Sequence, residues 1–190
     1  MSALVAVGVA ASVAACGSSA DTSAAATSPV EAAAAQARES GAAQDQLDIL
    51  ESGEVTFEQY ELAMNRAYEC MREAGVTVDV KGVKKYHGVT VIDATTQGDD
   101  EATAVADDCY LRHARFVDAY WQVSSPDAVA YADRRAAALK PLLQDCLTAR
   151  GIDWPSDASF DDLANLAFDP AAMTGNSNCL DEIGYSEWDG

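Results

Sequence analysis

The stretches ECMREAGV, residues 69–76, and DCLTARGI, residues 145–152, repeat one pattern. In both, an acidic residue, a cysteine and a long apolar residue are followed, after three variable positions, by glycine and a β-branched residue. This spacing is typical of the last turn of a helix, because glycine adopts the left-handed conformation there and the flanking apolar residues close a Schellman cap. We therefore predict two helices that end at Gly75 and Gly151, each with a cysteine one turn before its end.

The first of these helices has an equally clear beginning. Thr56 and Gln59 have the spacing of a capping box, in which each side chain bonds the backbone N–H of the other. Val55 and Tyr60 fit the hydrophobic contact that accompanies such a box. The sequence therefore predicts a capped helix from about residue 56 to Gly75.

Each repeated stretch is followed by another cysteine on a further helical segment. Cys109 lies in an apolar stripe of helical spacing over residues 101–121, and Cys179 lies in a short turn over residues 178–183. We interpret this as internal duplication. The predicted fold is mainly α, a single domain over residues 46–190, built of two tandem helix–connection–helix units at about 53–124 and 125–188.

The connections within the two units differ. Residues 76–80 and 89–93 alternate β-branched and polar side chains around glycines, which predicts a small β-hairpin at 76–93 packed on the helices. In the second unit, residues 159–168 form a short amphipathic pattern that predicts a helix. The long middle helix is expected to begin at Ser125-Pro126, a good pair for a helix start.

Residues 3–13 form an apolar run that is too short to span a bilayer and is typical of a signal-peptide core. It leads into VAAC, residues 13–16, which resembles the lipobox of bacterial lipoproteins, although no basic residue opens the segment. The resemblance implies cleavage of a signal peptide, residues 1–15, and acylation of Cys16. The alternative is ordinary cleavage nearby, which would leave Cys16 as a free thiol.

The five cysteines fit this interpretation, because removal of Cys16 to a lipid leaves an even set of four in an exported protein. No CxxC pair or histidine at ligand spacing accompanies them, so we expect disulfides and no metal. Duplication favours pairing inside each unit, as Cys70–Cys109 and Cys146–Cys179. The alternative is a crossed pairing that joins the two units.

Residues 17–44 consist mostly of Ala, Ser and Thr and carry few large apolar side chains. Such a composition buries too little apolar surface to offset the entropy of ordering. We therefore expect residues 16–45 to be the lipidated cysteine and a flexible Ala/Ser tether.

These features together resemble a group of secreted lipoproteins, uncharacterised in activity, from actinobacteria, the high-GC Gram-positive bacteria. The match is carried by the lipobox, the Ala/Ser segment, the helix start at residues 53–60 and the Cys-[Met/Leu]-x3-Gly helix ends. The resemblance implies an architecture and a place on the extracytoplasmic face of the cell membrane. It implies no activity.

The formal net charge of −19 disfavours nucleic acid and anionic polymers as partners. No GxSxG, HExxH, P-loop or GxGxxG motif is present, and the two histidines, His87 and His113, have ordinary turn and helix settings. We therefore expect no catalytic residue and no cofactor. The predicted function is a non-catalytic binding or scaffolding module of the cell envelope, attached to the membrane by lipid, with an envelope protein or ligand as its partner.

Two alternatives to this function stay open. One is a ligand-binding accessory lipoprotein of a transporter or sensor, and the other is an enzyme with an unrecognised site. A pocket present in each of the two units, with convergent polar groups, would favour the first, and a flat acidic patch with an apolar rim would favour a protein partner. Aromatic side chains at five positions could form a sugar-binding face, although their spacing is more typical of core residues: Tyr68, Tyr120, Trp121, Trp154 and Trp188.

Overall fold

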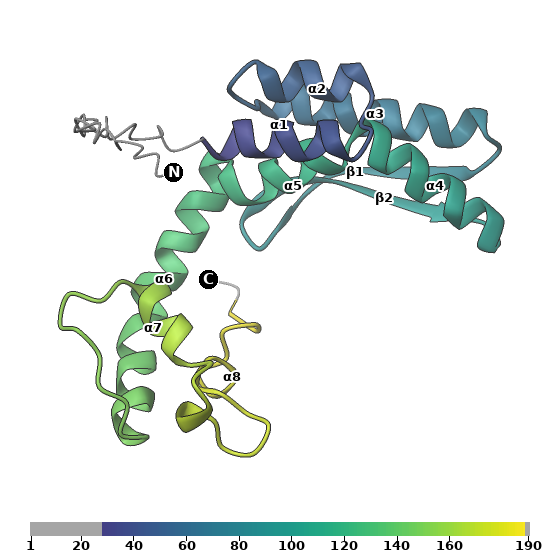
Figure 1. Ribbon diagram of the computed structural model, residues 1–190. Helices are drawn as coiled ribbons and strands as arrows, with labels where there is room; N and C mark the ends of the chain where they lie inside the picture. The colour runs from purple at the N-terminus through teal and green to yellow at the C-terminus, as the bar shows by residue number, and fades with distance from the viewer. Residues whose placement is uncertain (1–27, 189–190) are drawn as a thin grey trace, which may run out of the picture.

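The computed structural model describes residues 28–188, which form eight α-helices and one antiparallel hairpin. Two lobes are joined by the long helix α6 (Figure 1). The predicted mainly helical fold with a small hairpin and two disulfides is confirmed. In chain order the elements are α1 (Pro29–Glu39), α2 (Gln44–Glu51), α3 (Phe57–Glu73), β1 (Thr77–Tyr86), β2 (Val89–Gln97), α4 (Asp100–His113), α5 (Arg115–Ser124), α6 (Pro126–Ala149), α7 (Phe160–Leu166), a 3-10 turn (Pro170–Ala172) and α8 (Cys179–Glu182).

The repeated stretches are capped helix ends. The N–H of Val76 donates to the carbonyl of Met71 at 2.9 Å, and the N–H of Ile152 donates to the carbonyl of Leu147 at 3.0 Å. The glycines that precede these donors have positive φ angles, 88° at Gly75 and 72° at Gly151. These bonds satisfy carbonyls that a helix end otherwise leaves free.

Each disulfide joins two helices of the same lobe, one disulfide to a lobe, as duplication predicted. Cys70–Cys109 links α3 to α4 with a Cα–Cα distance of 5.7 Å. Cys146–Cys179 links α6 to α8 with a Cα–Cα distance of 5.8 Å. The crossed pairing is excluded.

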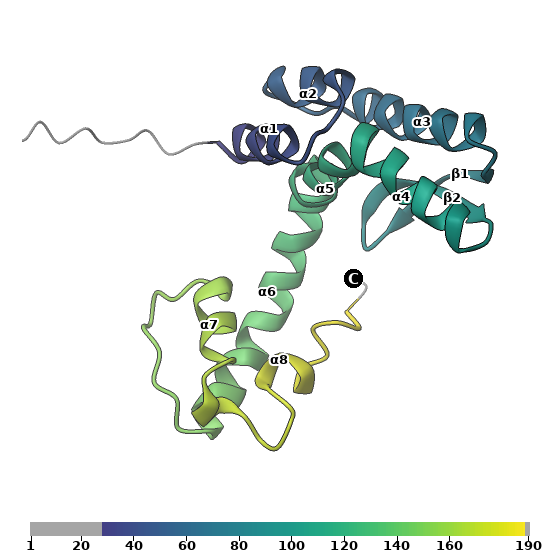
Figure 2. The same cartoon turned by 45° about the vertical axis from the view of Figure 1, so that its right-hand side comes forward.

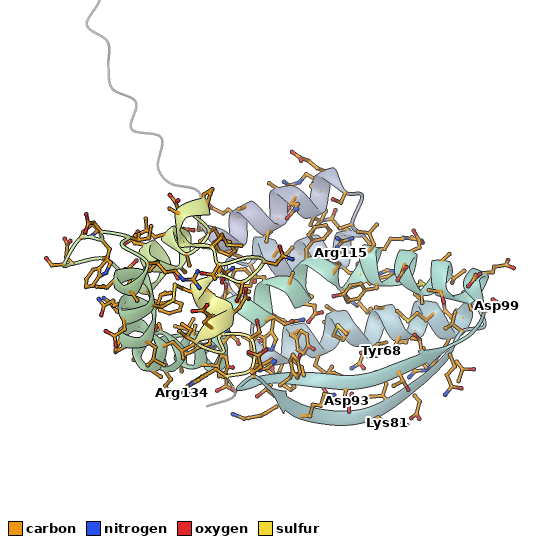
Figure 3. The ribbon with its side chains drawn as sticks, turned by 90° about the horizontal axis from the view of Figure 1, so that it is seen from below. Tyr68, Lys81, Asp93, Asp99, Arg115 and Arg134 are labelled. Carbon is orange, nitrogen blue, oxygen red and sulfur yellow. A yellow bond between two sulfur atoms is a disulfide. The ribbon has the colours of Figure 1, made fainter. Side chains whose placement is uncertain are left out.

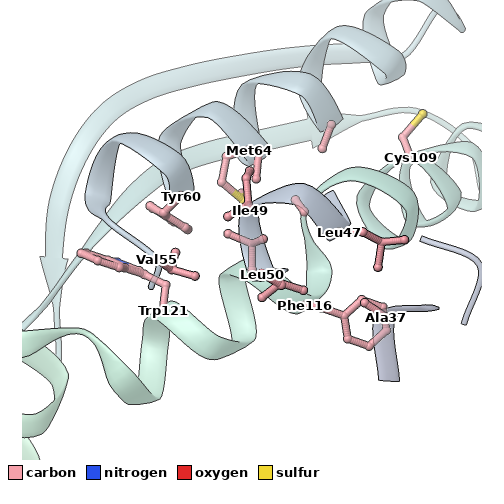
Figure 4. Close-up of a cluster of buried hydrophobic side chains, with 14 of the residues drawn as sticks. Ala37, Leu47, Ile49, Leu50, Val55, Tyr60, Met64, Cys109, Phe116 and Trp121 are labelled. Carbon is pink, nitrogen blue, oxygen red and sulfur yellow. The ribbon is translucent and has the colours of Figure 1, made fainter. Parts of the chain in front are cut away.

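Each lobe has a hydrophobic cluster of its own. The first is formed by α1 to α5, the hairpin and the start of α6. Figure 4 shows part of it, in which the rings of Tyr60 and Trp121 stack with their centroids 5.5 Å apart. The second lies between the last turns of α6, α7 and α8, and includes Leu143, Leu147 and Leu163. Helix α6 therefore contributes to both lobes, with its first turns in one and its last turns in the other.

The hairpin extends along α3 and α4 (Figure 3) and is longer than the predicted 76–93, with β2 continuing to Gln97. Two side chains of the first cluster fasten it by bonds to the β2 backbone. The hydroxyl of Tyr60 accepts from the N–H of Ile92 at 3.1 Å, and Trp121 Nε1 donates to the carbonyl of Thr90 at 2.8 Å. The hairpin is thus held by the helices, as a two-stranded sheet requires.

The predicted flexible tether is wrong for residues 29–39, which form helix α1. Ser28 and Glu31 make a capping box at its start, and Val30, Ala34 and Ala37 are buried against α2 and α5. A helix this short is marginal alone, but tertiary packing stabilises it. Small alanines carry little apolar area, yet they let helices approach closely, and the composition argument missed this. Residues 1–27 and 189–190, including the signal segment and Cys16, lie outside the described residues.

The predicted helical stripe over 101–121 is divided into α4 and α5 at Ala114, whose φ and ψ angles are −135° and −35°. The buried side chain of Gln46 spans this break. Its Nε2 donates to the carbonyls of Leu111 (3.0 Å) and Arg112 (2.8 Å), and its Oε1 accepts from the N–H of Phe116 at 2.7 Å. A polar side chain from α2 therefore replaces the backbone bonds that the break removes.

Candidate functional site

The hairpin turn lies against α6 where the two lobes meet. Its two central residues both have positive φ, 45° at His87 and 76° at Gly88, which is the geometry of a tight two-residue hairpin turn. A Cβ atom at Gly88 would lie 2.8 Å from a ring carbon of Tyr131 on α6. Glycine is therefore required here for its backbone conformation and for the close approach of the turn to the helix.

A groove with a volume of about 280 Å³ lies beside this contact. Three segments line it: residues 86–91 of the hairpin, residues 122–123 at the end of α5, and residues 128–135 of α6. We call it the junction groove. Figure 2 shows α6, which supplies one wall of the groove, passing from one lobe to the other.

The walls of the junction groove are mostly apolar. Val89 and Val91 come from β2, and Ala128 and Ala132 come from α6. At the rim, Val123 is 71% exposed. Isolated exposed apolar residues are ordinary, but a contiguous apolar hollow is typical of a binding surface.

Tyr131 forms the base of the groove and is 5% exposed. Its hydroxyl donates to the carbonyl of Trp188 at 2.5 Å and lies 3.3 Å from Nδ1 of His87. Its ring centroid is 5.2 Å from that of Trp188. The segment after α8 thus returns to α6 and packs beside the hairpin turn.

Arg135 supplies the positive charge of the groove. The carbon of its guanidinium lies 4.1 Å from the ring centroid of Tyr185 and 5.3 Å from that of Tyr131, so the cation is held between two aromatic faces. Across residues 28–188, no Asp or Glu forms an ion pair with Arg135, although Asp133 and Asp161 border a second hollow that Arg135 also lines. No carboxylate lines the junction groove in the described part of the chain.

Asp127 fixes the start of α6 to the hairpin beside the groove. Its carboxylate accepts from Thr90 Oγ1 at 2.8 Å and from Lys85 Nζ at 3.2 Å. These hydrogen bonds, that from Thr90 foremost, lower the pKa of Asp127 because they favour the ionised carboxylate. The hairpin is therefore attached to α6 by Asp127 and by the contact of Gly88 with Tyr131.

A buried tyrosine cluster lies inside the first lobe. Burial raises the pKa of Tyr60 to about 12 and the pKa of Tyr68 to about 12. Burial and the hydrogen bond that Tyr110 donates to Asp118 at 2.5 Å raise the pKa of Tyr110. Asp118 also accepts from Gln122, which lines the junction groove. We interpret the cluster as a structural support for the groove, because its phenols stay protonated and packed.

Of the residues singled out in the sequence, His87 and Trp188 meet at Tyr131 beside the junction groove, and the capping and core residues have structural roles elsewhere. Thr56 and Gln59 form the capping box of α3, with N–H to oxygen distances of 3.2 Å and 2.8 Å. His113 lies 3.0 Å from Asp45, far along the chain from His87 in the hairpin turn. Of the aromatic residues considered for a sugar-binding face, Tyr68 and Trp121 are buried in the first cluster. Within residues 28–188, no group of three His, Cys, Asp or Glu side chains is placed to hold a metal ion.

The sequence reasoning missed the residues that form the groove. Tyr131 and Arg135 are four positions apart on α6, a signal that predicts a shared helix face but does not identify a ligand site. The contact with His87 and Trp188 joins parts of the chain that no local pattern connects. Comparisons with protein-family models, curated proteins and solved structures find no match for this chain.

Proposed function

We propose that the protein is a lipid-anchored binding module on the extracytoplasmic face of the cell membrane, with the junction groove as its ligand-binding surface. On this proposal it belongs with the secreted actinobacterial lipoproteins that its sequence motifs resemble. The observation that carries the binding role is the apolar groove where the lobes meet, together with Arg135, a cation that forms no ion pair among residues 28–188.

The proposed location rests on the two disulfides and on the lipobox. Two disulfides are consistent with an oxidising, extracytoplasmic compartment. Among the described residues, no helix is long and apolar enough to cross a membrane. The lipobox at residues 13–16 supplies the proposed attachment, through Cys16.

The shape of the site favours ligand binding over scaffolding. A docking surface for a basic protein partner would be flat and acidic, whereas the junction groove is concave and lined by neutral and cationic side chains. Such a site suits a ligand-binding lipoprotein that serves a transporter or sensor. The proposal includes no catalysis, since neither a carboxylate nor a cysteine lines the groove in the described part of the chain.

The anchor is tested by phase partition of the protein from cell extracts with a temperature-separating non-ionic detergent. The native chain is expected in the detergent phase, because a cysteine with two or three acyl chains is held stably by apolar surroundings. Cys16→Ser is expected in the aqueous phase. Equal partition of the two chains would contradict the anchor.

The groove is tested by photo-crosslinking in intact cells, with a photoreactive amino acid at Val123 on the rim. The matched control carries it at Phe168, which is 64% exposed and lies outside the groove. A discrete mass adduct at position 123 that is missing at position 168 is expected. The same adducts at both positions would mean that the groove has no binding role.

A further inference from the structure

We propose that the junction groove selects a small amphiphilic anion, a ligand with a flat apolar body and one acidic group. This inference rests on the proposed binding function and names the class of ligand. Its basis is the juxtaposition of an apolar hollow with the guanidinium of Arg135, which has aromatic neighbours and no carboxylate partner among residues 28–188.

The size and lining of the groove set the apolar part of the ligand. A volume of about 280 Å³ is at the lower end of small-molecule sites, so it suits a ligand of about two or three rings. The valines of β2 and the alanines of α6 offer dispersion contacts, and the rings of Tyr86 and Tyr131 offer flat faces. A flat apolar body matches this lining better than a hydrated polar one.

Arg135 determines which acidic group the proposed ligand carries and where that group binds. Arginine stays charged and presents a planar fork of donors that matches the two oxygens of an acidic group. Stacking between Tyr131 and Tyr185 restricts the side chain before a ligand arrives, so less entropy is lost on binding. Arg135 as a whole is half-buried, and partial removal from water strengthens a charge-assisted hydrogen bond relative to one made in water.

The net negative charge of the protein does not prevent an anion from binding in direct contact with Arg135. The net charge is −19, but at physiological ionic strength interactions between exposed charges decay over about 8 Å. Within residues 28–188 no acidic side chain lines the groove, and Arg135 is the charged side chain of its lining, while the carboxylates of Asp127, Asp133 and Asp161 lie outside that lining. An anion is therefore favoured there although the surface as a whole is acidic.

An extended peptide added to the hairpin edge is a poorer occupant. Strand β1 carries three lysines, and a bulge between Val80 and Gly82 interrupts its register. Charged side chains and bulges of this kind block the addition of another strand. The small anion is the occupant that the observations favour.

The test compares two fluorescent dyes that differ in one group. 1-Anilinonaphthalene-8-sulfonate carries a sulfonate, and N-phenyl-1-naphthylamine is the same molecule without it. Both are titrated against the full chain with Cys16→Ser, so that no acyl chain or micelle takes up dye. Arg135→Gln is compared with Arg134→Gln, the neighbouring exposed arginine, which does not line the groove.

We expect Arg135→Gln to weaken binding of the sulfonate dye by about tenfold or more, the usual effect of losing a charge-assisted hydrogen bond. The neutral dye should change by less than about twofold, and Arg134→Gln should leave both dyes within about twofold. Arg135→Lys should restore part of the preference, since it keeps the charge. Melting temperatures of all variants show whether the fold is kept, and Arg135→Lys carries the test if Arg135→Gln unfolds.

Ala132→Trp, which fills the groove, separates failure of this inference from failure of the proposed function. If it abolishes binding of both dyes but Arg135→Gln affects them equally, the groove binds apolar ligands without preference for anions, and the inference is overturned alone. Equal loss in Arg134→Gln and Arg135→Gln would overturn it in the same way. If Ala132→Trp leaves both dyes bound as before, the groove is not a binding site and both proposals fall.

Discussion

Gln46 is a fully buried polar side chain at the break between two helices. It donates to two carbonyls at the end of α4 and accepts from the N–H groups of Phe116 and Val117 at the start of α5. Each group of the amide is thus satisfied, and so are backbone groups that would otherwise be buried without a partner. Leaving such groups unpaired costs about 1–3 kcal/mol each.

We predict that Gln46→Leu lowers the free energy of unfolding by about 3 kcal/mol, because leucine fills a similar volume but satisfies none of these backbone groups. The matched control is Gln44→Leu, at an exposed position of the same helix, with an expected change below about 0.5 kcal/mol. Urea unfolding followed by circular dichroism measures both. Equal effects would show that Gln46 is not needed at the break.

The buried tyrosines lead to a prediction in alkaline solution. Their folded pKa values lie above the ordinary value of about 10, so the stability that they contribute is fully present below pH 10. It is lost as the pH rises toward 12, because the unfolded state releases the phenolic protons first. Absorbance at 295 nm should show Tyr60, Tyr68 and Tyr110 ionising only well above pH 10. Ionisation of Tyr60, Tyr68 and Tyr110 near pH 10 would contradict the buried cluster.

At the scale of elements, the hairpin turn depends on Gly88 for two separable reasons. Gly88 and Gly41 both have a φ of 76°, but a Cβ at Gly41 would meet nothing within 4 Å. A comparison of the two glycines therefore isolates the contact with Tyr131 from the backbone strain.

We predict that Gly41→Ala costs about 1 kcal/mol from the strained backbone alone. Gly88→Ala should cost more and should weaken binding of both dyes at the junction groove, because the turn must move away from Tyr131. Thermal unfolding and dye titration measure the two effects. If the two alanine variants behave alike in both measurements, the turn does not press on α6 as described.

Helix α1 is a second element whose role can be tested directly. Arg38 is the first trypsin site of the chain, and it lies inside α1 with its guanidinium 2.5 Å from Glu51. We predict that the folded protein resists cleavage there. Ala37→Glu places a charge at a position that is 0% exposed and should release α1 for cleavage, whereas Ala35→Glu, at an exposed position, should not. Rapid cleavage of the native chain at Arg38 would show that α1 is not docked.

At the scale of the whole molecule, two separate hydrophobic clusters imply that the lobes need not unfold together. The second lobe is small and depends on Cys146–Cys179, whose closure contributes about 3–4 kcal/mol by restricting the unfolded chain. The first lobe has the larger cluster and its own disulfide.

We therefore predict that Cys146→Ala with Cys179→Ala removes amide protection from α7, α8 and the last turns of α6, while α2, α3 and α5 keep theirs. Native-state hydrogen exchange with mass spectrometry measures this. Cys70→Ala with Cys109→Ala is the reciprocal control and should affect the first lobe. Loss of protection in both lobes from either pair would contradict two independent clusters.

Local signals predicted the parts of this fold that depend on near neighbours. The glycine at each helix end, the capping box at Thr56 and the β-branched alternation before Gly88 each act within a few residues, so the sequence reveals them. The disulfide pairing followed from repetition of one such signal. The extent of the hairpin was underestimated, because its strands pack on α3 and α4, and such contacts between distant segments leave no local pattern in the sequence.

The junction groove could not be predicted in this way, because its lining comes from residues 86–91, 122–123 and 128–135. The sequence alone predicts an exposed helix residue at Arg135. Its stacking on Tyr185 depends on how the segment after α8 packs against α6. Gln46 was hidden for the same reason, as a glutamine in an acidic helix predicts a solvated face. The docking of α1 was mispredicted because composition counts apolar area and not how closely small residues let helices pack.

The docking of α1 also fixes how far this protein can stand from the membrane under the proposed anchor. Cys16 and the first described residue, Ser28, are twelve positions apart, and a fully stretched chain covers at most about 3.5 Å per residue. The linker between Cys16 and Ser28 therefore reaches at most about 40 Å, which is less than a flexible segment extending to residue 45 would reach. A molecule held at that height samples a thin layer next to the lipid headgroups. Its ligand would have to be encountered there, close to the bilayer, and could not be collected from the outer reaches of the envelope.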